Sequence, residues 1–515
     1  MSAVSKILSA EIDGLDAEFV EVEADLNVGL HSFNIVGLAD KAVSEAKERV
    51  NSALKNSGIR PPSRENRKIT VNLAPADVKK AGSKFDLPIA LAYLSASEQI
   101  RPFDAKKKIF IGELSLDGGV RPVSGSLSIS ILAGKNGISE VFVPYENAAE
   151  AAVIRSVRVF PVRTLNDLVA HLEGRQMIPQ TPYSAVVPSK PRNTISISDI
   201  RGQENAKRAL AISAAGGHNI IMSGPPGTGK TMLAQALSSI LPPPSPEEII
   251  ETTQIYSVAG LTAQTMPFVS WRPFRAPHHS ASAVSIIGGG TNPKPGEVSL
   301  AHRGVLFLDE IPEFHRDVLE SLRQPLEEGF VRVARTKKTV VFPARFTLVA
   351  AMNPCPCGYF EDPEKECVCT ANEIMRYQKK ISGPLLDRID IQIFIPRVKV
   401  EELRNGAEAA HGEPKKKTEE KIAVARKLQE NRFAECFPRI YSNSEMNSKL
   451  TEKYANLDTD AEVFLKRALE KSFVSPRGYY RILKVSRTIA DLDASFNIKK
   501  EHLAEAFHYR LKIEE

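Results

Sequence analysis

The pattern of hydrophobic and polar positions divides the 515-residue chain into parts with different periodicity. Residues 1–176 alternate short β-type runs with stretches of helical period, which predicts an α/β domain. The predicted strands of this domain are 19–22, 68–73, 109–114 and 141–144. The predicted helices are 42–57 and 87–95. Residues 177–194 hold four prolines and show little periodicity, so we expect an extended interdomain linker there.

A second α/β pattern occupies residues 195–400, where a strand, a glycine loop and a helix are followed by further buried strands. This order is typical of a doubly wound nucleotide-binding core. Residues 401–420 are polar and predict a solvated loop. Residues 421–515 carry helical periodicity with apolar faces, so we expect a C-terminal helical domain.

Composition adds limits to this picture. Hydrophobic residues at 42% and charged residues at 25% are typical of a globular protein and exclude a wholly disordered one. The net charge of +6, from 68 basic and 62 acidic groups, permits a nucleic-acid partner without requiring one. The sequence has no signal-like start and no uninterrupted apolar run long enough to span a bilayer, so we expect a cytoplasmic protein with no membrane partner.

A phosphate-binding loop lies between the strand at 219–223 and the helix that follows it. Its residues are Gly224, Pro225, Pro226, Gly227, Thr228, Gly229, Lys230 and Thr231. The spacing GxxxxGK[ST] in a strand–loop–helix context predicts an ATP site, with Lys230 reaching the β- and γ-phosphates and Thr231 binding Mg²⁺. An accidental glycine-rich turn is the alternative, and the flanking strand and helix argue against it.

Two acidic residues follow the apolar strand 305–308. We expect Asp309 to hold the metal ion and Glu310 to polarise the attacking water. A polar residue, Asn353, follows another apolar strand at a position that can orient this water. Arg388 and Arg477 come later, and the residues alone leave open whether they are ordinary salt-bridge formers.

Four cysteines are crowded into one short segment: Cys355, Cys357, Cys367 and Cys369. Four thiolates suffice for a closed tetrahedral structural zinc site, although the C-x-C spacing is tighter than the usual C-x₂-C. Free cysteines packed in a loop are the alternative.

The order of these motifs resembles that of the AAA+ ATPases, among them the magnesium-chelatase-like clade and, most closely, the ComM/YifB family. The most specific motifs are RPFRAPHH at 272–279, KPGEVSLAH at 294–302, NPCPCG at 353–358 and SGPLLDRID at 382–390. The resemblance implies that Asn353 is sensor 1, Arg388 the arginine finger and Arg477 sensor 2. It also implies a homo-hexameric ring, because an arginine finger acts on the ATP of a neighbouring subunit.

The resemblance also implies elements that line the pore of such a ring. Residues 280–297 look like an insertion within helix 2, and residues 330–342 look like a β-hairpin before sensor 1. The basic residues of the hairpin are Arg332, Arg335, Lys337 and Lys338. They suit contacts with DNA phosphates, although lysines also protect solvated hairpin edges.

The N-terminal domain, residues 1–176, resembles the proteolytic fold of Lon protease. Asp86 aligns where Lon carries its nucleophilic serine, and Leu127 aligns where Lon carries its lysine base. A carboxylate cannot replace that serine, and leucine cannot accept its proton, so this domain is expected to be non-proteolytic.

Together with the ATP and Mg²⁺ site, the resemblance to the ComM/YifB family implies an AAA+ ring motor acting on single-stranded or branched DNA, as a helicase or branch-migration factor in recombination or natural transformation. Two alternatives remain open: a magnesium-chelatase-type ATPase subunit, and a Lon-like protease or protein remodeller.

Overall fold

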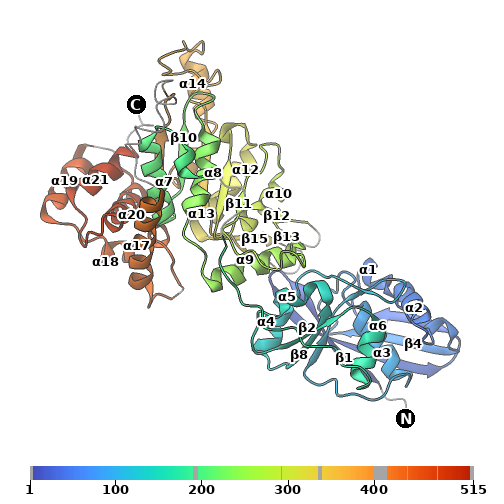
Figure 1. Cartoon of the computed structure of the whole chain (residues 1–515). Helices are drawn as coiled ribbons and strands as arrows, with labels where there is room; N and C mark the ends of the chain where they lie inside the picture. Colours follow the sequence, from blue (N-terminus) through green and yellow to red (C-terminus); the bar gives the residue numbers. More distant parts are fainter. Residues whose placement is uncertain are drawn as a thin grey trace. The chain divides into compact units, whose positions relative to one another are not determined.

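The computed structural model describes residues 4–189, 195–290, 293–334, 339–398, 415–437, 439–471 and 474–510. The chain forms two compact units (Figure 1). The first unit comprises Met1–Val187, Pro246–Ser270 and Ala334–Phe342, and the second comprises Pro188–Ser245, Trp271–Val333 and Pro343–Glu515. Two segments of the predicted core at 195–400, residues 246–270 and 334–342, therefore belong to the first unit.

A four-stranded sheet in the order β1-β2-β4-β3 is the main sheet of the first unit. Strands β1 (Ser5–Asp13), β2 (Asp16–Val28) and β4 (Arg67–Ala74) pair antiparallel, and β3 (Ser32–Val36) pairs parallel with β4. Buried and less buried residues alternate along β2 and β4, as a sheet with one covered face requires. The buried face packs against α3 (Asp86–Ala96).

The rest of the first unit is a three-stranded parallel sheet with helices, and it completes the predicted α/β pattern. The sheet order is β5 (Lys108–Phe110), β8 (Glu140–Pro144), β9 (Arg158–Val162). Its helices include α2 (Ala46–Asn56), α4 (Ser126–Lys135), α5 (Ala148–Ala151) and α6 (Leu165–Leu172). Three of the four predicted strands are present as single strands, whereas the predicted strand 109–114 is divided between β5 and β6 (Glu113–Leu114), which pairs with β7 (Val120–Arg121) in a separate two-stranded sheet. The predicted helix at 42–57 is interrupted at Glu45 between α1 (Lys41–Ser44) and α2.

Helix α9 (Pro246–Ala259) belongs to the first unit although it follows the P-loop helix in the sequence. It packs against α4. The Gln254 side chain donates a hydrogen bond to the Leu15 carbonyl oxygen at 2.8 Å. The Ser257 hydroxyl donates to the buried carboxyl of Glu150 at 3.1 Å.

The second unit is built on a five-stranded parallel sheet in the order β11-β14-β17-β10-β18. These strands are β11 (Phe274–Arg275), β14 (Val305–Leu308), β17 (Thr347–Met352), β10 (Ile220–Ser223) and β18 (Ile391–Phe394). The three central strands are almost wholly apolar and buried, as expected of a parallel sheet covered on both faces. Helices α7 (Glu204–Gly216), α8 (Lys230–Ile240), α12 (Arg316–Ser321) and α13 (Arg323–Glu328) belong to this unit.

The C-terminal part of the second unit is a helical bundle, as predicted (Figure 1). Its helices are α17 (Lys415–Phe433), α18 (Ser448–Tyr454), α19 (Thr459–Lys471), α20 (Pro476–Leu492) and α21 (Lys500–His508). Helix α20 packs against α7 and ties the bundle to the sheet. The predicted loop at 401–420 is wrong for residues 415–420, which form the first turns of α17; lysine and glutamate favour helix and attract each other across a turn. Its other residues lie outside the described part of the chain.

Among the described helices, none combines the length and the apolar character needed to cross a membrane.

Candidate functional site

The predicted phosphate-binding loop lies between β10 and α8, in the strand–loop–helix arrangement that the sequence indicated. Gly227 and Gly229 have φ angles of 80° and 83°, a left-handed conformation that glycine adopts without a steric cost. At Gly224 a Cβ atom would lie 2.3 Å from the carbonyl oxygen of Ile395, so only glycine fits beside β18. The backbone of the loop is therefore shaped by these glycines.

Lys230 lies at the first position of α8 and its ammonium group faces the loop. It donates to the carbonyl oxygens of Gly224 at 2.7 Å and Pro225 at 2.9 Å, and to Oδ1 of Asn353 at 3.2 Å. Burial lowers the pKa of Lys230, while the nearby Asp309 and Glu310 raise it. The structure thus brings the P-loop lysine and the predicted sensor 1 residue into direct contact.

The predicted magnesium ligands also lie together. The Thr231 hydroxyl donates to Oδ2 of Asp309 at 2.9 Å. Hydroxyl and carboxylate oxygens are the ligands that Mg²⁺ prefers, so this pair fits the ion. Glu310 adopts a left-handed backbone conformation with φ of 49°, and its side chain is 55% exposed. Its carboxylate lies 3.9 Å from Nδ1 of His279.

The carboxyl ends of parallel strands explain why these residues meet. Asp309 follows β14 and Asn353 follows β17, while the P-loop follows β10, and β17 pairs with both other strands. A further residue, Gln203, donates from Nε2 to the Thr228 carbonyl oxygen at 2.9 Å.

Arg388 and Arg477 lie together, away from these strand ends. Arg388 precedes β18, whose first residue pairs with the first residue of β10, so Arg388 lies at the amino ends of the strands, opposite the P-loop. Both arginines contact Glu327 on α13: Arg388 in a close ion pair, and Arg477 through Nη2 at 3.0 Å from Oε1. Arg388 is largely buried, whereas the Arg477 side chain is 58% exposed. Sequence reasoning missed Glu327.

A buried polar network joins the sheet to helix α20. Asp390 forms an ion pair with Arg481, and His218 lies between Oδ2 of Asp390 at 3.3 Å and the Thr488 hydroxyl at 2.8 Å. Burial opposes ionisation of Asp390, but Arg481 and His218 hold its pKa well below the usual range. The motif LLDRID at 385–390 therefore contributes both Arg388 and a carboxylate that attaches the helical bundle.

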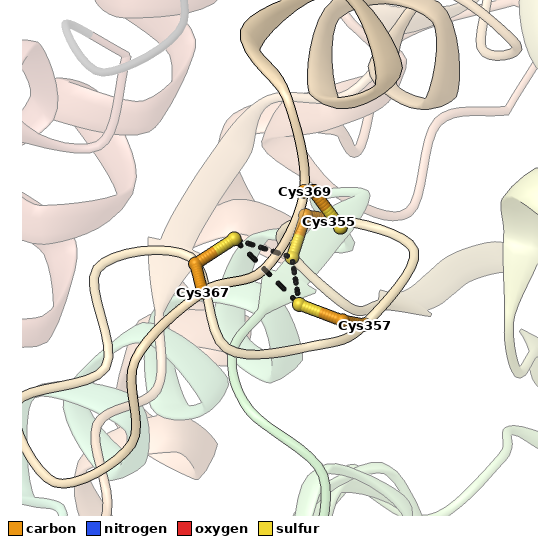
Figure 2. Close-up of side chains that lie close together, drawn as sticks. All are labelled: Cys355, Cys357, Cys367 and Cys369. Atoms are coloured by element: carbon orange, nitrogen blue, oxygen red, sulfur yellow. Dashed lines mark hydrogen bonds between the residues drawn. The ribbon is translucent and has the colours of Figure 1, made fainter.

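The four clustered cysteines lie on one loop between β17 and α14 (Ala371–Gln378), and Figure 2 shows their side chains converging. All are free, and their sulfur atoms lie within 4.8 Å of one another. The Sγ atom of Cys355 is 3.3 Å from that of Cys357 and 3.7 Å from that of Cys367. The Phe360 N–H group donates to the sulfur of Cys355 at 3.3 Å. This geometry suits a single tetrahedral metal ion.

The predicted basic hairpin is formed by β15 (Phe330–Ala334) and β16 (Thr339–Pro343), which make a two-stranded sheet. Arg332 is exposed and lies over the Phe330 ring. Arg335, Lys337 and Lys338 lie outside the described residues. The segment 280–297 contains α10 (Ala283–Ile287) and the short strands β12 (Gly288–Gly289) and β13 (Lys294–Pro295).

In the first unit, Asp86 and Leu127 are buried. Asp86 forms an ion pair with Arg49 at 2.6 Å and accepts a hydrogen bond from the Leu114 N–H group at 3.2 Å. Burial raises the pKa of Asp86 to about 6 even though Arg49 opposes the shift. These two positions therefore hold a structural ion pair and a core leucine.

Comparison with known proteins agrees with the fold and the motifs. Residues 196–403 match the family model of magnesium chelatase subunit ChlI, 22–147 match a second model of this subunit, and 412–510 match the model of its C-terminal part. The second unit is therefore a magnesium-chelatase-like AAA+ domain with a helical C-terminal region.

Relatives of full length refine this assignment. The chain is 44% identical to competence protein ComM of Haemophilus influenzae over 97% of its own length and 96% of that protein. It is 41% identical to the uncharacterized protein YifB of Salmonella typhimurium over 96% and 95%. A third match, with Lon protease of Rhizobium meliloti, has 27% identity over 33% of this chain and 22% of that protein. The chain belongs to the ComM/YifB family.

Proposed function

We propose that this protein is an ATP-hydrolysing AAA+ motor that works as a homo-hexameric ring on DNA, as a helicase or branch-migration factor. The observation that carries the proposal is the contact of Lys230 with Asn353 beside the Thr231–Asp309 pair, at the edge of the sheet opposite Arg388. One chain thus offers an ATP site at one edge and a cationic group at the other.

Within this site each residue has a role that its position supports. Lys230 and the loop N–H groups bind phosphates, and Thr231 and Asp309 would hold Mg²⁺, which would supply charge neutralisation on the phosphate oxygens. Glu310 polarises the attacking water, and Asn353 orients it. Arg388 cannot reach the P-loop of its own chain from the amino ends of the strands. We therefore propose that Arg388, with Arg477 beside it on Glu327, completes the ATP site of a neighbouring subunit.

The DNA part of the proposal has separate support. The Haemophilus influenzae relative is named a competence protein, and competence is the ability of a bacterium to take up DNA. The exposed Arg332 lies on the β15–β16 hairpin, whose sequence adds Arg335, Lys337 and Lys338. Such basic segments bind phosphates without base specificity. We propose a cytoplasmic location because ATP and the DNA substrates of recombination occur there.

We also propose that a structural zinc ion is bound by the four cysteines, Cys355, Cys357, Cys367 and Cys369. Four sulfurs that are each about 2.3 Å from one zinc ion lie about 3.8 Å apart, close to the separations of 3.3–3.7 Å found between Cys355, Cys357 and Cys367.

The second candidate function is that of a magnesium-chelatase-type ATPase subunit, which the family models favour. It shares the ATP site and differs in its target. ATP hydrolysis measured without DNA and with single-stranded, duplex, forked and four-way-junction DNA separates the two. We expect stimulation by single-stranded or branched DNA together with strand displacement, and less stimulation after Arg332→Ala. ATP hydrolysis that no form of DNA stimulates would agree with the proposed ATPase activity and contradict the proposed action on DNA.

A further inference from the structure

The cysteine loop, residues 354–370, contains no helix or strand. Loops of this length are uncommon inside a compact domain unless they are functional. Few of its side chains are deeply buried: Val368 is 84% exposed, Tyr359 and Phe360 are half-buried, and Cys355 is the one buried thiol among the four. Metal binding by the four converging thiols would therefore contribute the free energy that orders the loop.

This loop contacts the ATP site at several points. It begins directly after Asn353, whose Oδ1 atom accepts the hydrogen bond from Lys230. Gly358, with φ of 86°, packs so closely on the P-loop that a Cβ atom would lie 2.7 Å from the ring of Pro226. The Asp362 carboxylate forms an ion pair at 2.7 Å with Arg397, which lies shortly after the end of β18. The loop is thus held between the P-loop, the end of β17 and the end of β18.

We propose that zinc bound by the four cysteines positions Asn353 for hydrolysis, so that zinc occupancy controls the turnover of ATP more than its binding. The proposal rests on the ATPase function proposed above. The phosphate contacts come from Lys230 and the loop backbone, which lie between β10 and α8. The water-orienting amide, in contrast, lies two residues from Cys355, so loosening the loop displaces Asn353 first.

Zinc is the metal that the sulfur geometry favours. A tetrahedral set of four thiolates accepts zinc or iron. A cluster of several metal ions would hold its four ligands further apart than one ion does, whereas these four sulfurs all lie within 4.8 Å of one another. The Phe360 N–H group donates to the sulfur of Cys355, the kind of outer contact that orients a metal ligand.

The test compares Cys367→Ser with Cys436→Ser, since Cys436 is a free, half-buried thiol outside the cluster. The measurements are zinc per chain by elemental analysis, affinity for a non-hydrolysable ATP analogue, and kcat. We expect Cys436→Ser to match the wild type. Cys367→Ser should lose zinc and at least about tenfold in kcat, while the affinity changes by less than about threefold.

Removal of zinc from the wild type with 1,10-phenanthroline in excess Mg²⁺ covers the case in which Cys367→Ser does not fold. We expect kcat to fall and to return when Zn²⁺ is added, with the far-ultraviolet circular dichroism unchanged. Wild-type protein without zinc, or with iron in its place, would overturn the proposal, as would full kcat in a zinc-free protein. Zinc at full occupancy in a protein that hydrolyses no ATP would refute the proposed ATPase instead.

Discussion

The ammonium group of Lys230 and the side-chain oxygen of Asn353 are hydrogen-bonded at 3.2 Å, which connects the P-loop to the end of the central strand β17. One residue of this pair is placed to bind phosphate and the other to orient water. Changes at the two positions should therefore have different effects on binding and on turnover.

Asn353→Ala should leave ATP affinity nearly unchanged and lower kcat roughly ten- to a hundredfold, because the amide orients the water while Lys230 keeps its carbonyl partners. Steady-state hydrolysis and analogue binding measure the two quantities. Asn372→Ala, an exposed position on α14, is the matched control and should retain wild-type activity. A large loss of affinity in Asn353→Ala would contradict the role.

Glu310→Gln should bind ATP and hydrolyse it at least about a hundredfold more slowly, because the amide cannot polarise the water. Lys230→Ala should lose nucleotide binding as well. Glu313→Gln is the control, since Glu313 pairs with Lys380 at 3.2 Å and is not expected to act on the water. Equal turnover by Glu310→Gln and the wild type would refute the assignment.

Mixtures of inactive variants test whether Arg388 acts on a neighbouring subunit. Lys230→Ala keeps Arg388 and lacks the ATP site, whereas Arg388→Ala keeps the site and lacks the arginine. Mixed rings should regain part of the activity, because some interfaces pair an intact site with an intact arginine. No recovery over a range of ratios, in rings that subunit exchange shows to be mixed, would indicate that the arginine acts within its own chain.

Asp390→Asn should destabilise the second unit by about 3 kcal/mol, since it leaves Arg481, whose side chain is only 21% exposed, without its carboxylate. Thermal unfolding measures this loss. Asp387→Asn is the control: Asp387 is 46% exposed and lies 3.7 Å from Arg510, so its loss should cost at most about 1 kcal/mol. Similar melting temperatures for the two variants would contradict the importance of the buried network.

Glu150 should make the stability of the first unit depend on pH. Burial raises the pKa of its carboxyl to about 7 from an ordinary value of 4.5, while hydrogen bonds from Thr262, Ser257 and Asn147 oppose the shift. The folded state therefore holds the proton more tightly, and the free energy of unfolding falls as pH rises from about 4.5 to about 7, by roughly 3 kcal/mol in total.

Glu150→Gln should remove that fall and stabilise the unit at pH 8 relative to the wild type. Urea unfolding at several pH values measures both effects. A wild-type stability that stays constant across this window would contradict the buried carboxyl.

The convergence of the P-loop, Asp309 and Asn353 could be predicted because these residues follow strands of one parallel sheet. Continuous apolar runs at 219–223, at 305–308 and directly before Asn353 indicated the strands. A parallel sheet brings the carboxyl ends of such strands together. Glu327 could not be predicted, since its contacts with Arg388 and Arg477 join positions far apart in the sequence. The assignment of α9 to the first unit was missed for the same reason: helical periodicity shows that a face is apolar and does not show what covers it.

The chain passes between the two units five times, because the segments 246–270 and 334–342 leave the second unit and return to it. After proteolytic cleavage between residues 188 and 194, the C-terminal fragment would still contribute the segments 246–270 and 334–342 to the first unit. A shortened protein that starts at residue 195 would strip α9 of its partners Leu15 and Glu150 and expose apolar surface to solvent. The first unit thus supplies the packing surface for a helix whose sequence follows the P-loop.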